Sequence, residues 1–471
     1  MNSKIAKNKY DAVIVGGGVS GLVCGCYLAR AGLQTILFEK NANAGGYSGS
    51  FLKKGFVFDA CAHALGSLRA GGFIDQVLKD LEIKDRLKMK RYDPSDIVIS
   101  KDFKLHFWSD IDKTIREFSA VFPKEAENIS RFFKDVIGLK NISLAQLKSK
   151  SFKDFLDSYF KEEKLIAAFS LPVLGNTSLS ASKISAYTAV ALYKEFILDG
   201  GYYPGTKMQD FVDILVKRFK EFGGEILPST LVEKISIKEG KVEGVYINKD
   251  EFIQSRYVIS NIDARQTFLD LVKGEIDIKF SDLLKDLVPS LSIFILYLGT
   301  DGQINSIPSG VNVWFLPNYD VENMYKIADK KTVDQSEWFM VRLAPNKKSI
   351  TMLVTSSFES PEYWAENKNR LIDVFIKKIE QVIPDLSKHV LFKDAATPNT
   401  LYKWTLNYRG AAYGWAGVPS QFAVPGLSQS TPIKNLYLTG HWTTLVQGIP
   451  GVVYLGRDTA TIILNREKIK K

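Results

Sequence analysis

The sequence predicts an α/β fold that begins with a parallel β–α–β unit. Residues 10–16 form an almost wholly apolar run that is typical of a buried strand, and a glycine-rich turn follows at once. Residues 19–31 continue as an apolar helix and residues 34–39 as a second strand. Because this spacing suits a right-handed crossover between parallel strands, we expect a Rossmann-like domain here.

The turn after the first strand has the spacing that holds a dinucleotide phosphate. Gly16, Gly18 and Gly21 fit the pattern G-x-G-x-x-G. The first glycine permits a tight turn, the second lets backbone amides approach a pyrophosphate, and the third lets the helix pack close to the strand. The helix that opens at Val19 and Ser20 offers unpaired N–H groups and its positive dipole end. The turn therefore predicts a pyrophosphate site.

A carboxylate and a glycine pair extend this site. Glu39 ends the second strand, 18 residues after Gly21 (39 minus 21), where it can bond the ribose hydroxyls of adenosine and disfavours the 2′-phosphate of NADP. Gly45 and Gly46 let the chain pass close to an extended ligand. FAD, whose ribityl chain continues beyond the pyrophosphate, needs that passage, so we expect FAD. The expected site also includes Lys40, Tyr47 and Ser48.

Composition limits the class of protein. The 471 residues are 45% hydrophobic and 24% charged, which suits two globular domains. Cys24, Cys26 and Cys61 form no disulfide framework, and neither they nor the four histidines have zinc-ligand spacing, so we expect no metal and a reducing, cytoplasmic setting. The polar residues 1–9 lack the apolar core of a signal peptide, and no run has the character of a membrane span.

The net charge of +10 leaves two interpretations open. No nucleic-acid motif accompanies it, so we expect no nucleic-acid partner. A solvated lysine-rich surface is the plainer interpretation, and weak attraction to anionic lipid is the alternative. Residues Phe152, Phe155, Leu156, Tyr159 and Phe160 share one helical face flanked by lysines, which predicts either a core helix or a helix at a membrane interface. Peripheral contact with the cytoplasmic membrane is therefore an alternative, and the oligomeric state stays open.

The rest of the chain divides into segments of two kinds. Further strands are expected at 55–59, 96–100, 104–108, 225–227, 232–238, 241–248, 256–260, 290–298, 349–356 and 434–439, and helices at 75–91, through 111–193, and at 208–222, 367–383 and 451–464. We expect a discontinuous FAD-binding domain over residues 1–91, 200–285 and 401–471. An inserted α+β substrate domain would cover residues 92–199 and 286–400.

Together these motifs resemble the phytoene desaturase branch of the flavin amine-oxidase superfamily, which includes carotenoid desaturases, carotenoid cis–trans isomerases and retinol saturases. The matching residues are 11–21 with Glu39, Gly45 and Gly46, and then 55–59, 223–226, 232–245, 258–264, 408–414 and 435–460. Residues 92–199 and 286–400 match weakly, as a variable substrate domain would. The resemblance implies an FAD-binding domain of the GR2 type.

The resemblance also implies contacts at the C-terminal end of the chain. In the family, the valine that Val232 matches meets the adenine through its backbone, and a late strand and helix start hold the flavin. Here those late positions are Gly440, Gly448, Ile449 and Pro450. Proline suits the first turn of a helix, whose positive end stabilises a reduced, anionic flavin.

One departure from the family concerns His441. Many relatives carry an acidic residue after Gly440, and a histidine cannot act as a carboxylate. A backbone contact at Gly440 is therefore carried over, and the role of the His441 side chain stays open.

Three side chains are candidates for catalysis. His63 and His441 fall inside flavin-site motifs and could move a proton beside the flavin, and the plainer interpretation of each is a hydrogen-bonded packing residue. Tyr413, with Trp415 beside it, could form a wall that sandwiches a flat apolar substrate against the flavin, or could only pack a glycine-rich turn.

The sequence supports four functional hypotheses. The first is desaturation or saturation of carbon–carbon bonds in an apolar isoprenoid or polyene substrate, with hydride passing between a substrate carbon and flavin N5. The second is redox-neutral cis–trans isomerisation of a polyene. The third is amine oxidation, which the weak match outside the flavin motifs disfavours. The fourth is a binding or assembly protein stabilised by FAD.

Overall fold

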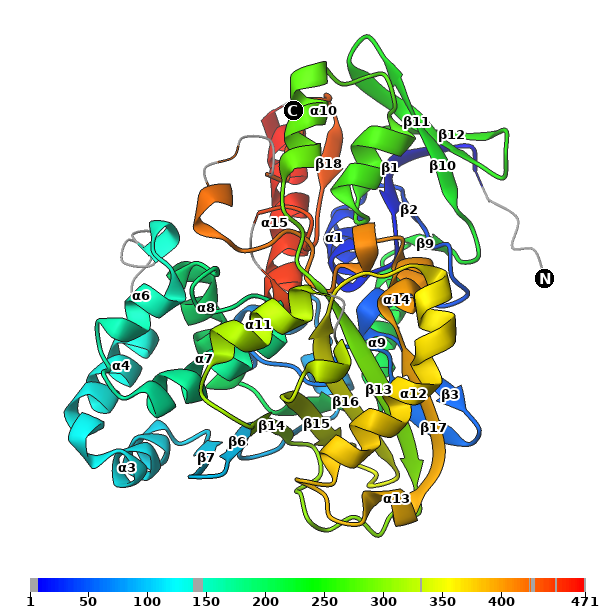
Figure 1. The fold of residues 1–471 in the computed structure, drawn as a ribbon. Helices are drawn as coiled ribbons and strands as arrows, with labels where there is room; N and C mark the ends of the chain where they lie inside the picture. Colours follow the sequence, from blue (N-terminus) through cyan, green and yellow to red (C-terminus); the bar gives the residue numbers. More distant parts are fainter. Residues whose placement is uncertain are drawn as a thin grey trace.

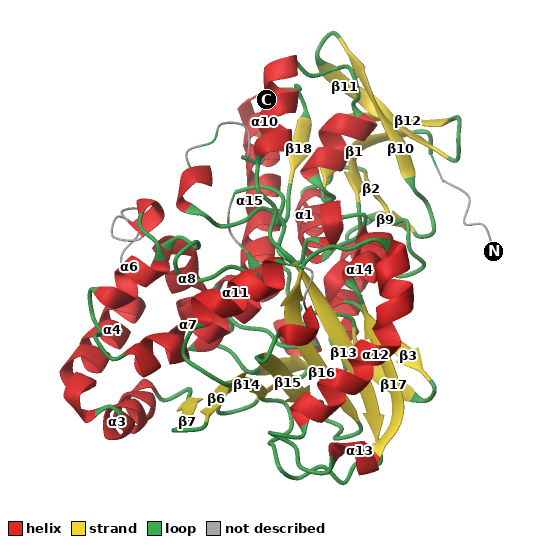
Figure 2. Cartoon of the chain, viewed as in Figure 1, coloured by secondary structure: helices red, strands yellow, loops and turns green. Residues whose placement is uncertain are grey.

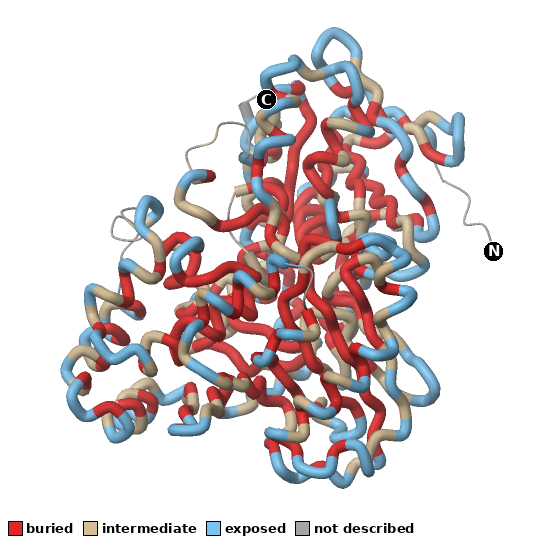
Figure 3. The backbone as a smooth tube through the Cα atoms, in the orientation of Figure 1, coloured by how far each residue is buried: buried red, intermediate tan, exposed pale blue. Residues whose placement is uncertain are grey.

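The computed structural model describes residues 7–138, 147–330, 333–422, 424, 428–444 and 447–469. The first six residues, which carry most of the polar N-terminus, lie outside the described residues. The described chain folds around two seven-stranded sheets, and the buried residues concentrate along both of them and in the region where they meet (Figures 1 and 3).

The first sheet contains the predicted β–α–β unit. Strand β1 (Lys9–Val15), helix α1 (Val19–Arg30) and strand β2 (Thr35–Phe38) follow one another, and β1 pairs in parallel with β2 and with β12. The strand order is β10-β11-β12-β1-β2-β9, and β18 pairs with β12. The other strands are β9 (Glu225–Leu227), β10 (Val232–Lys238), β11 (Lys241–Ile247), β12 (Glu251–Ser260) and β18 (Leu436–Leu438).

Both faces of this sheet are covered, which explains why the second half of β1, residues 12–15, is wholly apolar. Ala12 and Ile14 pack in one cluster with α1, α9 (Gln209–Glu221) and α15 (Gly448–Ile469). Val13 and Val15 pack in another with the π-helical turn η6 (Gln266–Leu271) and α10 (Ile278–Asp286). A strand buried on both faces has no polar alternation.

The second sheet is mainly antiparallel and has the order β17-β13-β16-β15-β14-β6-β7 (Figure 2). Its strands are β6 (Asp96–Ser100), β7 (Lys104–Phe107), β13 (Ser292–Thr300), β14 (Asn312–Leu316), β15 (Phe339–Leu343), β16 (Ser349–Ser356) and β17 (Val390–Ala396). They come from the segments expected to form the substrate domain, and the strands of the first sheet come from the other segments. The exact domain boundaries stay a prediction.

Helices gather on one side of the second sheet (Figure 1). They are α3 (Ile111–Val121), α4 (Ala126–Gly138), α6 (Phe152–Asp157), α7 (Glu163–Thr177), α8 (Ala186–Leu192) and the π-helical turn η5 (Tyr193–Ile197). Elsewhere lie α2 (Phe73–Asp80), α11 (Val321–Asp329), α12 (Pro361–Ile379), α13 (Leu386–His389) and α14 (Pro398–Thr405). The hairpin β3 (Ser50–Lys53) and β4 (Phe56–Asp59) includes the strand expected at 55–59.

The apolar face around α6 belongs to the core. Phe152, Phe155, Leu156 and Phe160 are buried, and Phe160 stacks on Phe169 of α7. The core interpretation of this segment is confirmed, and the membrane-interface interpretation is wrong. Among the described residues, no helix combines the length and apolarity needed to span a bilayer.

Several element boundaries differ from the prediction, among them those of two helices. The helix expected at 75–91 ends at Asp80, and Met89–Arg91 instead forms strand β5, paired with β8 (Tyr202–Pro204). The helix expected at 367–383 is α12, which starts at Pro361 because Ser360 caps its N-terminus and proline suits the first turn.

Candidate flavin site

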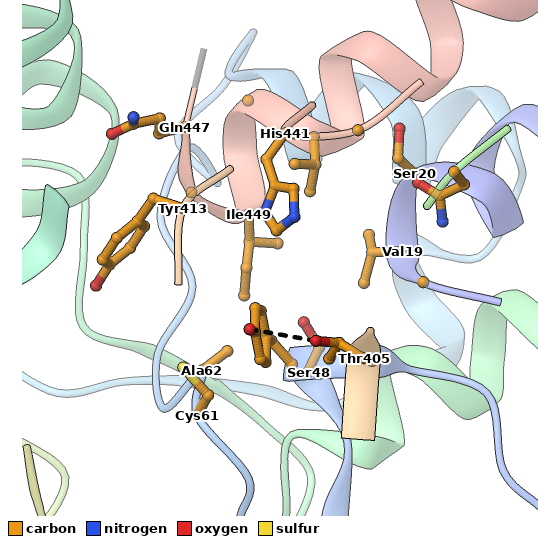
Figure 4. Close-up of a pocket in the computed structure, with 18 of the residues that line it drawn as sticks. Val19, Ser20, Ser48, Cys61, Ala62, Thr405, Tyr413, His441, Gln447 and Ile449 are labelled. Atoms are coloured by element: carbon orange, nitrogen blue, oxygen red, sulfur yellow. Dashed lines mark hydrogen bonds between the residues drawn. The ribbon is translucent and has the colours of Figure 1, made fainter. Parts of the chain in front are cut away.

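A single cavity of about 710 Å³ contains almost every predicted site residue. Figure 4 shows Val19 and Ser20 on one side of it, Tyr413 on the other, and His441 projecting between them. The predicted residues that line it are Gly16, Gly18, Val19, Ser20, Glu39, Lys40, Gly45, Gly46, Tyr47, Ser48, His63, Val232, Tyr413, Gly440, His441, Gly448, Ile449 and Pro450. Gly21 lies behind the wall, as its expected packing role requires.

The glycine turn is closely packed against the loop after β12. Gly16 has φ +95°, and a side chain at Gly21 would bring its Cβ to 2.6 Å from the Gly16 carbonyl oxygen. The Asn261 amide donates to that same carbonyl at 3.1 Å, and its Nδ2 would lie 2.9 Å from a Cβ at Gly18. Larger residues would therefore close the turn, so each glycine is sterically required.

Asn261 is a site residue that the sequence indicated only as part of a matching segment. Its Nδ2 reaches Gly16, and its Oδ1 would meet a Cβ at Gly440 at 2.7 Å. It therefore connects the turn before α1 with the loop after β18. Ser20 makes a second connection, since its hydroxyl lies 2.7 Å from that of Thr439.

The start of α1 offers an uncompensated positive end to the cavity. Its N-cap residue is Gly18, which has no side chain to cap the first-turn amides, and no acidic residue lies in the first turn. Free amides and the helix dipole at such an end bind phosphate. This cradle, which added Cβ atoms would fill, fits the pyrophosphate of FAD.

Glu39 is held in place before any ligand binds. One carboxylate oxygen accepts from the Gly17 amide at 2.8 Å and the other from the Asn41 amide at 2.8 Å. The side chain is only 6% exposed and lies at the cavity wall at the end of β2. This position suits the bonding of ribose hydroxyls, and the carboxylate retains further lone pairs for them.

A segment from far along the chain closes the site over β2 and the glycine pair. The carbonyls of Lys403 and Trp404 accept from Lys40 Nζ at 3.0 Å and from Asn41 Nδ2 at 3.1 Å. The Tyr47 hydroxyl donates to Ala411 at 2.9 Å. Trp404, Thr405, Leu406 and Asn407 line the cavity, and the Thr405 hydroxyl lies 3.4 Å from that of Tyr47. Sequence reasoning missed this segment because it carries no local motif.

His63 lies at the wall as a neutral ring. Its Nδ1 is 3.0 Å from the Cys61 carbonyl, which can only accept, so Nδ1 carries the proton. Its Nε2 is buried without a partner among the described residues. Burial, together with the charge of Arg342, lowers the pKa of His63 to about 4. This geometry favours a positioned neutral side chain over a proton donor.

Tyr413 presents its ring to the cavity and turns its hydroxyl away. The hydroxyl donates to the Gly175 carbonyl at 3.0 Å, and burial raises its pKa well above the usual value. Trp415 does not line the cavity, so its expected place in the wall is wrong. Its ring packs 4.9 Å from that of Trp442, and its Nε1 donates to the Trp442 carbonyl at 3.0 Å.

The second predicted helix start also faces the cavity. Helix α15 begins at Gly448, with Pro450 in its first turn, and both residues line the wall. The helix packs closely on α1, because a Cβ at Gly456 would lie 2.5 Å from the Ser20 carbonyl oxygen. The described residues contain no group of three or more histidine, cysteine or acidic side chains that could hold a metal ion.

Comparison with known proteins agrees with this geometry. The chain is 24% identical to all-trans-retinol 13,14-reductase of Rattus norvegicus, over 92% of this chain and 82% of that protein. It is 25% identical to prolycopene isomerase 2, chloroplastic, of an Oncidium hybrid cultivar (95% and 82% covered) and 24% identical to 4,4'-diapophytoene desaturase (4,4'-diapolycopene-forming) of Methylomonas sp (98% and 97%).

A solved structure supports the fold. An oxidoreductase from Methanosarcina mazei superposes with a TM-score of 0.66 at 20% identity, over 97% of this chain and 100% of that one. Residues 19–464 match the family profile of the flavin containing amine oxidoreductases. FAD, which the cradle fits, is the cofactor. The protein is an enzyme, and it belongs to the flavin containing amine oxidoreductase family.

Proposed function

We propose that this protein is an FAD-dependent oxidoreductase that desaturates or saturates carbon–carbon bonds of an apolar isoprenoid or polyene substrate. The observation that carries the proposal is the apolar wall beyond the cofactor cradle. This wall contains Ala62, Ala191, Leu192, Phe196, Leu353 and Tyr413. A flat hydrocarbon would gain free energy by leaving water for such a wall.

The charged groups of the cavity argue against a cationic amine substrate. Among the described lining residues, only Glu39 and Glu195 carry carboxylates. Glu39 is held by two backbone amides, and Glu195 pairs with Arg69 at 2.6 Å. Neither is free to balance an ammonium ion, whose burial without a partner is costly.

The similar proteins point to the same substrate class. Their names describe a retinol reductase, a prolycopene isomerase and a diapophytoene desaturase. All three names describe unsaturated isoprenoid compounds, and two of them describe a change in carbon–carbon bond order. They support both directions of the reaction, so the proposal includes both.

Each part of the chain has a distinct role in this proposal. Bound FAD supplies two-electron redox chemistry at its N5 position. Glu39, the glycine turn and the start of α1 would hold its adenosine and pyrophosphate, and the start of α15 would favour negative charge on its reduced form. Tyr413 would orient the substrate by ring contact. The neutral state of His63 keeps a charge out of the apolar wall.

Substitution of Tyr413 tests the apolar wall. Because the hydroxyl donates to Gly175 and points away from the cavity, Tyr413→Phe should keep at least half of the activity on a polyene. Tyr413→Ala should lower kcat/KM by tenfold or more, since it removes the ring that orients the substrate. FAD content, measured by absorbance, serves as the control for both variants. Equal losses in both variants would instead assign the function to the hydroxyl.

Redox-neutral cis–trans isomerisation is the second candidate, which the similarity to prolycopene isomerase favours. Anaerobic incubation of prereduced enzyme with a cis-polyene separates the two. Isomerised product with the flavin still reduced would support the isomerase, and stoichiometric reoxidation with a saturated product would exclude it.

We also propose peripheral contact with a lipid surface at one end of the cavity. The helix around Phe152 cannot make this contact because it is buried. Tyr454 is 39% exposed, and its ring centroid lies 5.1 Å from that of Phe73. Both residues and Lys194 line the cavity. Aromatic and basic side chains suit an anionic interface. Flotation with anionic vesicles should capture the wild type and lose Tyr454→Ser; equal flotation of both would contradict this contact.

A further inference from the structure

The ring of His441, whose role the sequence left open, is held by a chain of hydrogen bonds. The Trp442 indole Nε1 donates to Asn407 Oδ1 at 2.9 Å. The other end of the Asn407 amide, Nδ2, lies 3.4 Å from the Ala411 carbonyl and 3.5 Å from His441 Nε2. Asn407 and Trp442 are buried, although Asn407 also borders the cavity.

These partners fix which way the Asn407 amide points. An indole N–H can only donate, so the atom it meets must be the amide oxygen. The Ala411 carbonyl can only accept, so the atom it meets must be the amide nitrogen. Both contacts give the same orientation, which leaves the N–H₂ group of Asn407 beside His441 Nε2.

The fixed amide determines the form of the imidazole. Because Asn407 Nδ2 offers hydrogens, His441 Nε2 must accept, and the ring proton must sit on Nδ1. In an imidazolium, His441 Nε2 would also carry a hydrogen, so two donors would face each other at this contact. Among the described residues Nδ1 has no hydrogen-bond partner, and the ring projects into the cavity (Figure 4).

We propose that Trp442 and Asn407 hold His441 as the neutral Nδ1–H tautomer, and that this N–H donates to an acceptor on the flavin half of bound FAD. Asn407 is then a positioning residue and His441 a cofactor-binding donor in place of the family's acidic side chain. Only the hydrogen bond to FAD rests on the proposed function. The tautomer of His441, which Asn407 and Trp442 fix, is a property of the FAD-free chain.

Among the described residues, no charged group contributes to the pKa shift of His441. The ring centroid of Tyr47 lies 6.1 Å from that of His441, and burial raises the pKa of Tyr47 above its usual value. Burial alone lowers the pKa of His441, to about 4. The ring therefore stays neutral across the physiological range without help from a neighbouring cation.

Nitrogen NMR of the labelled imidazoles tests the tautomer of His441 directly. The chain has four histidines, so ¹⁵N-histidine gives a sparse spectrum that single substitutions can assign. In FAD-free wild type between pH 5 and 8, His441 should show a neutral Nδ1–H ring that does not titrate. An Nε2–H ring, or a titration near pH 6.5, would overturn the proposal without any variant.

Asn407→Asp reverses the polarity of the contact. A carboxylate can only accept when ionised, so it should draw a proton onto His441 Nε2 and bring the titration into the range of pH 5–8. An unchanged tautomer would overturn the role of Asn407. Asn305→Asp, on an exposed loop outside the cavity, is the matched control and should change nothing.

FAD titration tests the second half of the proposal. Asn407→Asp and His441→Phe should each weaken FAD binding about tenfold, as expected for the loss of one hydrogen bond to the cofactor. Unchanged affinity in both would remove His441 as a donor to FAD while leaving the tautomer result intact. Absence of FAD binding in the wild type would instead contradict the proposed function.

Discussion

The protein itself fixes the position of the Glu39 carboxylate, whereas the proposed role of that carboxylate depends on the bound ligand. Two backbone amides, from Gly17 and Asn41, hold it at the end of β2. The sequence could predict its position because the distance from the glycine turn is fixed by one helix and one strand. The two amide bonds could not be predicted, since they depend on the path of the turn.

Removal of this carboxylate should weaken FAD binding. Glu39→Ala loses the acceptor for the ribose hydroxyls and also frees the two amides, so we expect Kd to rise by about ten- to a hundredfold, or roughly 1.5–3 kcal/mol. Fluorescence titration with FAD measures it, and Glu366→Ala, an exposed glutamate on α12, is the control. An unchanged Kd for Glu39→Ala would contradict the ribose assignment.

The two histidines at the cavity should make the FAD-free protein sensitive to acid. The folded pKa of His63 and of His441 is about 4, below the ordinary value of 6.5, so the unfolded chain binds more protons between these limits. Stability from each group is therefore present above pH 6.5 and is lost as the pH falls toward 4. When the pH falls from 7 to 5, the titration of each histidine should lower the free energy of unfolding by about 2 kcal/mol.

Urea unfolding at the two pH values tests this expectation for His63. His63→Gln should lessen the loss between pH 7 and pH 5 by about 2 kcal/mol relative to wild type. His389→Gln is the control, because that ring is partly exposed and lies 2.9 Å from Asp301. The same pH dependence in wild type and His63→Gln would show that His63 titrates normally in the folded state.

At the scale of elements, two helix starts converge on one ligand. Helices α1 and α15 both open at the cavity and pack on each other where Gly456 meets the Ser20 carbonyl. The sequence predicted a helix at 451–464, whereas its packing partner could not be predicted from the sequence pattern. The contact joins the first and last helices of the chain, so it keeps the two ends of the flavin site together.

A larger residue at this contact should disturb the site. Gly456→Ala places a Cβ about 2.5 Å from the Ser20 backbone, which should cost about 1–3 kcal/mol and weaken FAD binding with it. Thermal unfolding with and without FAD is the measurement. Gly138→Ala, at a helical glycine with open space around it, should leave both values unchanged. A stable Gly456→Ala with normal FAD affinity would contradict the packing argument.

Other elements could not be predicted because their partners are distant. Met89–Arg91 reads as a charged helix end, and it becomes a strand only by pairing with Tyr202–Pro204. The segment over residues 403–407 has no motif, and it contacts Lys40 and Asn41 through carbonyl groups that any sequence would supply. By contrast, the early start of α12 had a local signal in Ser360 and Pro361.

At the scale of the whole molecule, the cavity is lined by residues of both sheet regions. The cofactor cradle comes from β1, α1, β2 and the C-terminal elements, and the apolar wall includes α8, η5 and Leu353 of β16. The sequence predicted the glycine turn and Glu39 by residue, because phosphate and ribose binding need a fixed motif. It predicted the substrate wall only as an apolar surface, since many combinations of residues line a hydrocarbon site equally well.

The central claim is that electrons pass between FAD and a carbon–carbon bond of an apolar polyene. The most direct measurement is the anaerobic visible spectrum of the FAD-loaded protein, mixed in its oxidised form with a partly saturated isoprenoid and in its reduced form with a conjugated polyene. We predict that one mixture changes the flavin's oxidation state, with one equivalent of desaturated or saturated product. An unchanged flavin in both mixtures, with neither compound altered, would contradict the account.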